Sequence, residues 1–383
     1  MPKTIAITPS WYWPTGISRV VGVPPYSIFD LCVVRNARRE PQAQALIDQQ
    51  GSVSYETLQD EVERRAQALA VAAGEAKLAV LPGTLTREAV IELLAGLAAG
   101  VRMHITAGDA GALAARVGAA VVAGQEPDGA TPAVPGPIDP RTAAVVIDGL
   151  DGAPVSHSNR SLLAMAISMA TYLDATQDGP WMSTLPLSSW EGLMAVLAPL
   201  HLGAALVIPP TGADPDTLLG LIPRHSVKYT VAGIEGFAHA CREAKRSAKD
   251  ARRQLSAALL AVDGPFDPDQ RRRVGKALEC PALTFWGMAE TGPVFASHPS
   301  WYIDESVGLP MTNAHVVPSD PRSGQPIQAL WELVEMAEVT VFSPSLPVQA
   351  PDADNSSRFV HNRFRTGMMA SSDANGMIYL LGR

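Results

Sequence analysis

The feature that most constrains the fold is a regular alternation, in the first third of the chain, of short apolar runs with longer amphipathic segments. The runs predict strands at 77–81, 101–105 and 119–123, and the segments between them predict helices at 87–99 and 109–117. Each helix is followed by a glycine, Gly100 or Gly118, which readily adopts the left-handed conformation that ends helices. Strands that alternate with helices pair in parallel, so this rhythm predicts a mostly parallel sheet covered by helices.

A hairpin and a capped helix precede this unit. Residues 45–47 and Val53 lie on either side of Gln50-Gly51, which predicts two short antiparallel strands. Ser54 is a good helix N-cap, and Gly74 is a good stop for the helix that follows. The apolar stripe of this helix is Leu58, Val62, Ala66, Leu69 and Ala73.

The alternation resumes after a connector rich in proline and glycine, residues 125–141. Strands are predicted at 143–147, 204–208, 229–232 and 257–262, and helices at 159–172, 190–201 and 268–278. Beyond about residue 307 the pattern changes to period-two strands at 331–336, 339–342 and 377–381.

These patterns predict an α/β protein with two stacked, mostly parallel α/β subdomains and a smaller β-rich subdomain. We place the first α/β subdomain at residues 1–141, the second at 142–306 and the β-rich subdomain at 307–383.

Composition narrows the class of protein. Apolar residues make up 47% of the 383 residues and charged residues 18%, which favours a large core. The net charge of −8 argues against a nucleic-acid surface, because no basic stripe is present to displace counterions. Cys32, Cys241 and Cys280 are too scattered for a disulfide framework or a zinc site. No stretch is apolar enough for a membrane span, and the first residues do not read as a secretory segment, so we expect a cytoplasmic protein.

One phrase carries a resemblance to a known family. The segment 285–292, FWGMAETG, resembles the Y-G-x-T-E motif of the adenylate-forming (AMP-binding) superfamily, which includes acyl-CoA synthetases, aryl-acid ligases and luciferases. In that family the aromatic residue flanks the adenine of ATP or AMP and the glutamate helps to hold Mg²⁺. The resemblance therefore implies nucleotide contacts at Trp286 and Gly287, and a magnesium-binding role for Glu290.

Other segments resemble the same family in the same order along nearly the whole chain. They are 13–31, 37–41, 45–47 and 54–58 (an opening typical of fatty-acyl ligases), 185–187 with 192–193 and 202–204, 262–265, 365–367, and 373–383. The resemblance implies the fold of the family's large N-terminal domain. It also implies cofactor contacts at Gly264, Pro265 and Arg383, and an acyl pocket lined by Trp190, Gly192, Leu193 and Met288.

The chain departs from the family where the nucleotide would bind. The family's phosphate loop, S-G-T-T-G-x-P-K-G, corresponds here to a degenerate loop without the lysine, containing Asp148, Gly149, Asp151 and Gly152. Two carboxylates near a triphosphate repel it, and a phosphate cradle normally supplies backbone N–H groups and a cation instead. Met368 replaces the aspartate that binds the ribose hydroxyls in the family, and a thioether cannot accept two such hydrogen bonds.

Two functions remain open. The first is a degenerate acyl-CoA ligase-like pseudoenzyme, a catalytically impaired auxiliary protein that binds an acyl group or a partner protein, with weak or absent adenylation. The second is an acyl-activating enzyme that adenylates a carboxylate with ATP and Mg²⁺ and passes it to CoA or a carrier protein. The family's small C-terminal domain, which carries a catalytic lysine, would follow Arg383, so this enzyme would need that domain from another chain. We assign no catalytic residue.

Three smaller patterns have simpler interpretations. Gly149 and Gly152 do not complete the G-x-G-x-x-G pattern of dinucleotide sites. Ser156 and His157 are adjacent, and we expect a helix-capping role for a serine here rather than a nucleophile pair. The run 271–273, three arginines on a predicted helix, predicts a solvated face.

Overall fold

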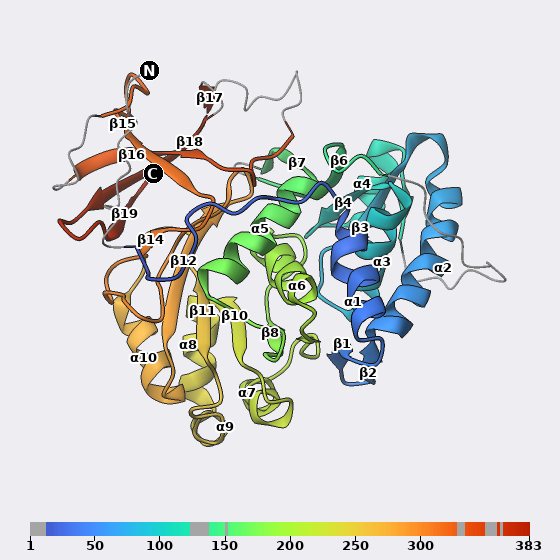
Figure 1. Cartoon of the computed structure of the whole chain (residues 1–383), viewed down its shortest axis with the longest axis horizontal. Coiled ribbons are helices and arrows are strands. Elements are labelled where there is room, and N and C mark those ends of the chain that lie inside the picture. Colours follow the sequence, from blue (N-terminus) through green and yellow to red (C-terminus); the bar gives the residue numbers. More distant parts are fainter. Residues whose placement is uncertain (1–12, 123–137, 150–151, 328–333, 349–357, 361–362) are drawn as a thin grey trace.

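The computed structural model describes residues 13–122, 138–149, 152–327, 334–348, 358–360 and 363–383. Figure 1 shows two α/β layers side by side and a smaller, strongly twisted sheet at one corner, which bears out the predicted α/β fold with a β-rich subdomain. Of the segments singled out in the sequence, most of the 125–141 connector, Asp151 and residues 331–333 lie outside the described residues.

The largest sheet has nine strands in the order β14-β13-β12-β11-β10-β8-β9-β1-β2. Its strands are β1 (Gln44–Asp48), β2 (Gly51–Ser54), β8 (Trp181–Ser183), β9 (Leu206–Val207), β10 (Tyr229–Gly233), β11 (Ala257–Ala261), β12 (Ala282–Met288), β13 (Gly292–Ala296) and β14 (Leu309–Pro310). The six central strands, from β12 to β1, are parallel, and the antiparallel partners lie at the edges. This arrangement fits a sheet whose centre is buried under helices.

The second α/β sheet has five strands in the order β5-β3-β4-β6-β7. They are β3 (Leu78–Pro82), β4 (Arg102–Thr106), β5 (Ala120–Val121), β6 (Ala143–Asp148) and β7 (Pro154–Ser158). Sheet membership cuts across the predicted boundary at residue 141, because β1 and β2 join the nine-stranded sheet while β6 and β7 join this one.

The β-rich subdomain is an antiparallel sheet in which β19 pairs with β18. Its strands are β15 (His315–Ser319), β16 (Val334–Phe342), β17 (Phe359–Val360), β18 (Arg363–Ser372) and β19 (Ile378–Gly382). Alternate residues of β18 are buried, as the period-two pattern predicts.

Ten α-helices lie in the described residues, together with a π-helical stretch at Phe29–Val34 and a 3₁₀ turn at Gly74–Ala76. They are α1 (Arg35–Arg39), α2 (Tyr55–Ala73), α3 (Arg87–Ala99), α4 (Ala110–Val117), α5 (Asn159–Tyr172), α6 (Trp190–Leu202), α7 (Pro215–Arg224), α8 (Ile234–Glu243), α9 (Lys245–Asp250) and α10 (Pro268–Leu278). Helices α5 and α6 lie between the two sheets in Figure 1, and nearly all of their side chains are buried. No helix in this part of the chain is both long and apolar enough to cross a lipid bilayer.

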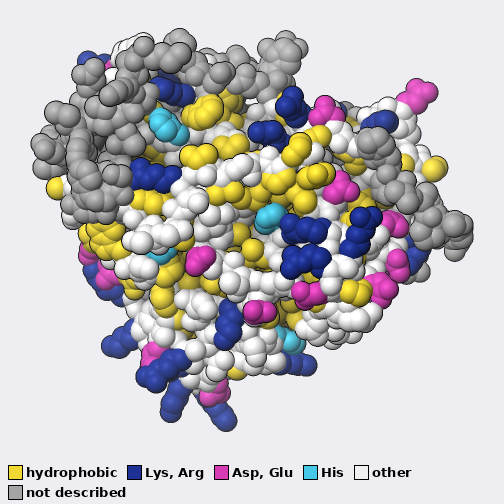
Figure 2. Space-filling view, viewed as in Figure 1, with side chains coloured by type: hydrophobic (Ala, Val, Ile, Leu, Met, Phe, Trp, Pro, Cys, Tyr) yellow, Lys and Arg dark blue, Asp and Glu magenta, His cyan; other side chains and the backbone are white. Residues whose placement is uncertain are grey.

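The core consists of two main clusters. One fills the space between the two α/β sheets around α5 and α6, and the other lies between the outer face of the nine-stranded sheet, helices α7 to α10 and the inner face of the β-rich sheet. On the surface view of Figure 2, acidic and basic side chains are interspersed among hydrophobic ones. Strand β12 contributes to both main clusters, so its carboxyl end is fixed from two sides.

Candidate functional site

The family-like motif forms the hairpin between β12 and β13. Phe285 to Met288 are the last residues of β12, so the motif lies within the strand and its turn. A Cβ atom on Gly287 would lie 2.0 Å from the carbonyl oxygen of Gly292, which leaves no room for any side chain. Thr291 closes the turn, because its Oγ1 accepts from the Met288 N–H at 3.0 Å and donates to the Gly292 carbonyl at 2.9 Å.

The segment corresponding to a phosphate loop lies directly against this hairpin. A Cβ on Gly149 would be 2.6 Å from Oε1 of Glu290, and the Glu290 residue is 1% exposed. Two backbone N–H groups of this loop are already used within it: Gly149 donates to the Ala153 carbonyl at 2.7 Å and Gly152 to the Gly149 carbonyl at 3.1 Å. Asp148 is exposed at the end of β6.

His157 of β7 connects the same two elements. Its side chain is fully buried, with Nε2 2.7 Å from the Ala289 carbonyl oxygen and Nδ1 3.3 Å from Oγ of Ser161. Burial lowers the pKa of His157 to about 4, so the ring is neutral at pH 7. The helix cap is Ser158, which forms a capping box with Ser161.

The loop after β11 and the middle of β18 meet on the other side of β12. The Trp286 residue is 0% exposed, donates from Nε1 to the Asp263 carbonyl at 3.3 Å and stacks on Phe295 with ring centroids 5.7 Å apart. Met368 is 2% exposed, and its methyl carbon would lie 3.7 Å from a Cβ on Gly264. The ribose-contact position of the family is therefore occupied here by a thioether packed into the core.

Pro265 and Arg383 complete this side of the site. Cγ of Pro265 would be 4.0 Å from a Cβ on Gly382, the residue before Arg383. Arg383 itself is exposed. The folding of the chain thus places the adenine-loop segment next to the end of β19, although strands β12 to β18 lie between them in the sequence.

The residues assigned to an acyl pocket are tightly packed, with no space for a side chain at Gly192 or Gly287. Trp190 packs edge-to-face on Phe285, with centroids 5.9 Å apart, and its Cη2 would be 3.0 Å from a Cβ on Gly287. Gly192 lies against the backbone, since a Cβ there would be 1.8 Å from the Pro186 carbonyl oxygen. Leu193 and Met288 are buried in the two main core clusters. The pocket roles of these residues stay predictions.

Glu191 is a candidate functional residue that the sequence analysis did not identify. It lies in the first turn of α6, where Ser189 caps the helix. Burial, and to a smaller extent the nearby Asp263, raises the pKa of Glu191 to about 7, so this carboxyl group can hold a proton near neutral pH. An acidic residue in the first turn directly after the 185–187 segment was the available signal. No group of three or more His, Cys, Asp or Glu in the described ranges is arranged to hold a metal ion.

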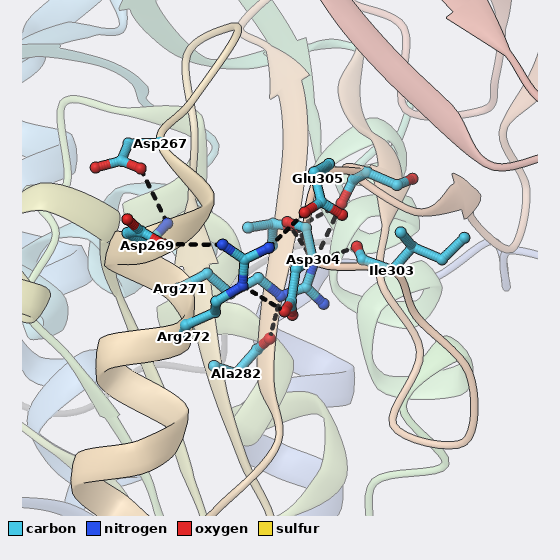
Figure 3. Close-up of polar contacts among 10 residues, drawn as sticks. Asp267, Asp269, Arg271, Arg272, Ala282, Ile303, Asp304 and Glu305 are labelled. Atoms are coloured by element: carbon cyan, nitrogen blue, oxygen red, sulfur yellow. Dashed lines mark hydrogen bonds and ion pairs between the residues drawn. The ribbon is translucent and has the colours of Figure 1, made fainter.

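The interpretation of the arginine run 271–273 as a solvated face is wrong for Arg271, which is 1% exposed. Its Nε donates to the Ala282 carbonyl at 2.8 Å, and its Nη1 donates to the carbonyls of Ile303 and Ser306 at 2.9 and 3.1 Å. Figure 3 shows Arg271 and Arg272 between α10 and the 303–305 segment. Burial lowers the pKa of Arg271 to about 10, which leaves it charged at pH 7.

Arg272, one residue later, points to the surface. It pairs with Asp269 and Asp304 at 2.8 Å each and also with Glu305. Successive helix positions face different directions, which is why one arginine of the run is buried and the next is solvated.

Comparisons with known proteins agree with this architecture. A family model described as "AMP-binding enzyme" matches residues 152–341, about half of the chain. No curated protein sequence matches. Among solved structures, the nonribosomal peptide synthetase FmoA3 is similar with a TM-score of 0.81 and 20% identity, over 97% of this chain and 44% of that one.

Two smaller proteins are similar over more of their own length. O-succinylbenzoate coenzyme A synthetase (MenE) from Bacillus subtilis, in complex with ATP and magnesium, has a TM-score of 0.79 and 19% identity over 92% of this chain and 79% of that one. MatB from Rhodopseudomonas palustris has a TM-score of 0.81 and 18% identity over 94% and 79%. At these identities the structural matches show the fold, and the chain spans less than half of FmoA3. With the family-model match and the segments that follow the motif order, the chain belongs to the AMP-binding family of adenylate-forming proteins.

Proposed function

We propose that this chain is a degenerate, acyl-CoA ligase-like member of the family, an auxiliary protein that binds an acyl group or a partner protein without efficient adenylation. One observation carries the proposal: the positions that the resemblance assigns to the nucleotide are closed. Met368, Trp286 and Glu290 are 2%, 0% and 1% exposed. ATP and Mg²⁺ are the cofactors that family membership implies, so the question is whether these residues fit them.

The residue at the position assigned to the ribose contact, Met368, does not fit a nucleotide. Met368 offers no acceptor for ribose hydroxyls, and its side chain packs with Trp286 and Phe295 in one core cluster. A charge-assisted hydrogen bond contributes about 1.5–3 kcal/mol, and its absence weakens nucleotide affinity by up to that amount.

The phosphate position fits poorly as well. A cradle for phosphate needs backbone N–H groups directed at the ligand, whereas Gly149 and Gly152 donate within their own loop. Asp148 adds a negative charge where a triphosphate would approach.

The apolar residues assigned to the acyl pocket are compatible with binding of an acyl group. Trp190, Leu193 and Met288 are apolar but buried, so they could line an acyl pocket only if it opened; burying an acyl chain contributes about 0.8 kcal/mol per methylene. Because Trp190 contacts Gly287, an acyl chain would enter only if the Trp190 ring moved. CoA or a carrier protein is the expected carrier of the acyl group, and the three buried thiols support a reducing compartment such as the cytoplasm.

The proposal is tested by titrating ATP·Mg²⁺ calorimetrically into the wild type, Met368→Leu and Met368→Asp. We expect no saturable binding in the millimolar range for the first two, and a gain for Met368→Asp if it folds, which thermal melting checks. Submillimolar ATP binding by the wild type, or acyl-dependent pyrophosphate release faster than about 1 s⁻¹, would overturn the proposal.

A second function has one observation in its favour. Gly149 and Glu290 are in contact, so the loop expected to meet phosphates lies beside the carboxylate expected to meet magnesium, as adenylation would need. The candidate is an acyl-activating enzyme that adenylates a carboxylate with ATP and Mg²⁺. The pyrophosphate assay, repeated with CoA and with proteins that co-purify, separates the two: turnover that depends on an added chain supports the enzyme.

A further inference from the structure

A cavity lies between the N-terminal segment 13–23 and the start of the β-rich subdomain, away from β12. Its volume is about 430 Å³, within the usual range of ligand sites, and most of its lining is apolar, including Trp13, Val21 and Met311. Val20 and Phe342 extend the apolar lining to the surface, with 81% and 50% exposure. The lining contains no residue of β12, α6 or the loop 262–265.

The charged side chains that line this cavity are both arginines. Arg19 and Arg160 line it, and none of its lining residues is acidic. The guanidinium of Arg19 lies over the Trp13 ring, 5.0 Å from its centroid, which holds one cation against the apolar wall. His315 adds no charge at pH 7, because burial and then Arg363 lower its pKa. An apolar cavity with two cations favours a ligand with an apolar body and one negative charge.

Asn313 supplies a further donor. It is 8% exposed, lines the cavity, and its Oδ1 accepts the Val21 N–H at 2.8 Å, so the other side-chain atom is the NH₂ group. Within the described residues this Nδ2 has no hydrogen-bond partner. A buried donor without an acceptor is destabilising, and an anionic oxygen would satisfy it.

We propose that this cavity binds an amphiphilic anion, with its tail against Trp13, Val21 and Met311 and its head group at Arg19, Arg160 and Asn313. The site is separate from the one discussed above, and the proposal does not depend on whether the chain adenylates or binds an acyl group near Trp190. A carboxylate and a phosphate share the required chemistry, so the test includes both.

The test is calorimetric titration of decanoate, decyl phosphate and decanol into the wild type and Asn313→Asp. This variant suits the backbone, since Asn313 has φ of 67° and Asp tolerates that region, and it keeps an acceptor for the Val21 N–H. It replaces the NH₂ donor by a negative oxygen. We expect saturable binding of at least one anion to the wild type, tighter than decanol, and at least a tenfold loss in Asn313→Asp with decanol unchanged.

Arg160→Gln is a second variant, on a different element, and should weaken the anions without changing decanol. The better of the two anions identifies the head group. Absence of anion binding at millimolar concentration, equal affinity for decanol and the anions, or unchanged anion affinity in both variants would overturn the proposal. Binding that survives in these variants but is lost in Trp190→Ala would assign the ligand to the β12 site instead.

Discussion

The two ends of strand β12 are both buried, but different contacts hold them. At the amino end, Ala282 accepts a hydrogen bond from the buried cation Arg271. At the carboxyl end, Gly287 has no room for a side chain beside Gly292 and Trp190. Packing alone therefore requires glycine at position 287, whether or not the chain binds a nucleotide. A motif residue can be retained for the fold, and activity is better judged from positions such as Met368, where packing accepts an apolar replacement.

The largest effect should come from the carboxyl end. Gly287→Ala places a methyl group against a carbonyl oxygen, so the hairpin must open, and we expect a loss of about 4 kcal/mol in the free energy of unfolding. Urea denaturation followed by tryptophan fluorescence measures it. Gly236→Ala, in α8 with nothing within 4 Å of its Cβ position, is the matched control and should be neutral or slightly stabilising. A wild-type midpoint for Gly287→Ala would refute the packing argument.

The next largest loss of stability should come from substitutions at the amino end of β12. Arg271→Gln removes the donor shared by the Ala282, Ile303 and Ser306 carbonyls and should cost about 3 kcal/mol, as for a broken buried network. Arg271→Met retains much of the volume and tests whether charge or packing matters. If Arg271→Met were as stable as wild type, the hydrogen bonds would not be what fixes this end.

The free energy of unfolding should also depend on pH through His157, which contacts Ala289 just after the carboxyl end of β12. Burial lowers the pKa of His157 to about 4 in the folded protein, below the ordinary value of 6.5. As pH falls from 6.5 to 4 the unfolded chain takes up a proton that the folded protein does not, so stability is full above pH 6.5 and decreases by about 2–3 kcal/mol towards pH 4. His157→Gln should flatten this slope in part, since His201 has a similarly low pKa. Parallel pH profiles for the two proteins would contradict the assignment.

The smallest effect should come from the surface arginine. Arg272→Gln breaks ion pairs with Asp269, Asp304 and Glu305, but these pairs are solvated. We expect the midpoint of thermal unfolding to move by no more than about 2 °C, and less in high salt. A shift as large as that of Arg271→Gln would erase the distinction between the two neighbours.

Local signals predicted the capped helices best. Helices α3, α5 and α10 begin and end as the sequence indicates, and the side chains of Thr86, Ser158 and Asp267 cap their first turns. Strand β18 was not predicted, and within the described residues the two strands predicted near 331–342 are one strand, β16. The shorter helices α1, α7, α8 and α9 and the strands β7, β8, β13, β14, β15 and β17 were not predicted either. These short elements depend on packing against distant parts of the chain more than on their own pattern.

The candidate site was predictable only in outline. The resemblance assigned nucleotide or magnesium contacts to the positions of Gly149, Glu290, Gly264 and Met368. The structure brings Gly149 close to Glu290 and Gly264 close to Met368, while their roles stay predictions. The burial of Arg271 was not predictable from its helix, because its acceptors lie on residues 282 and 303–306. The same holds for the pKa of Glu191, which is set mainly by surroundings contributed from other elements.

The pairing of β1 with β9 has a consequence for how the chain folds during synthesis. Leu46 of β1 pairs with Leu206, about 160 residues later, and β1 has only β2 as an earlier neighbour. At about 5–20 residues per second, the ribosome needs roughly 10–30 s to supply β9 after β1 has emerged. During that interval the edge of the β1–β2 hairpin is open to other strands. A nascent chain stalled before residue 206 should therefore be more prone to aggregation and to chaperone capture than one stalled after residue 261.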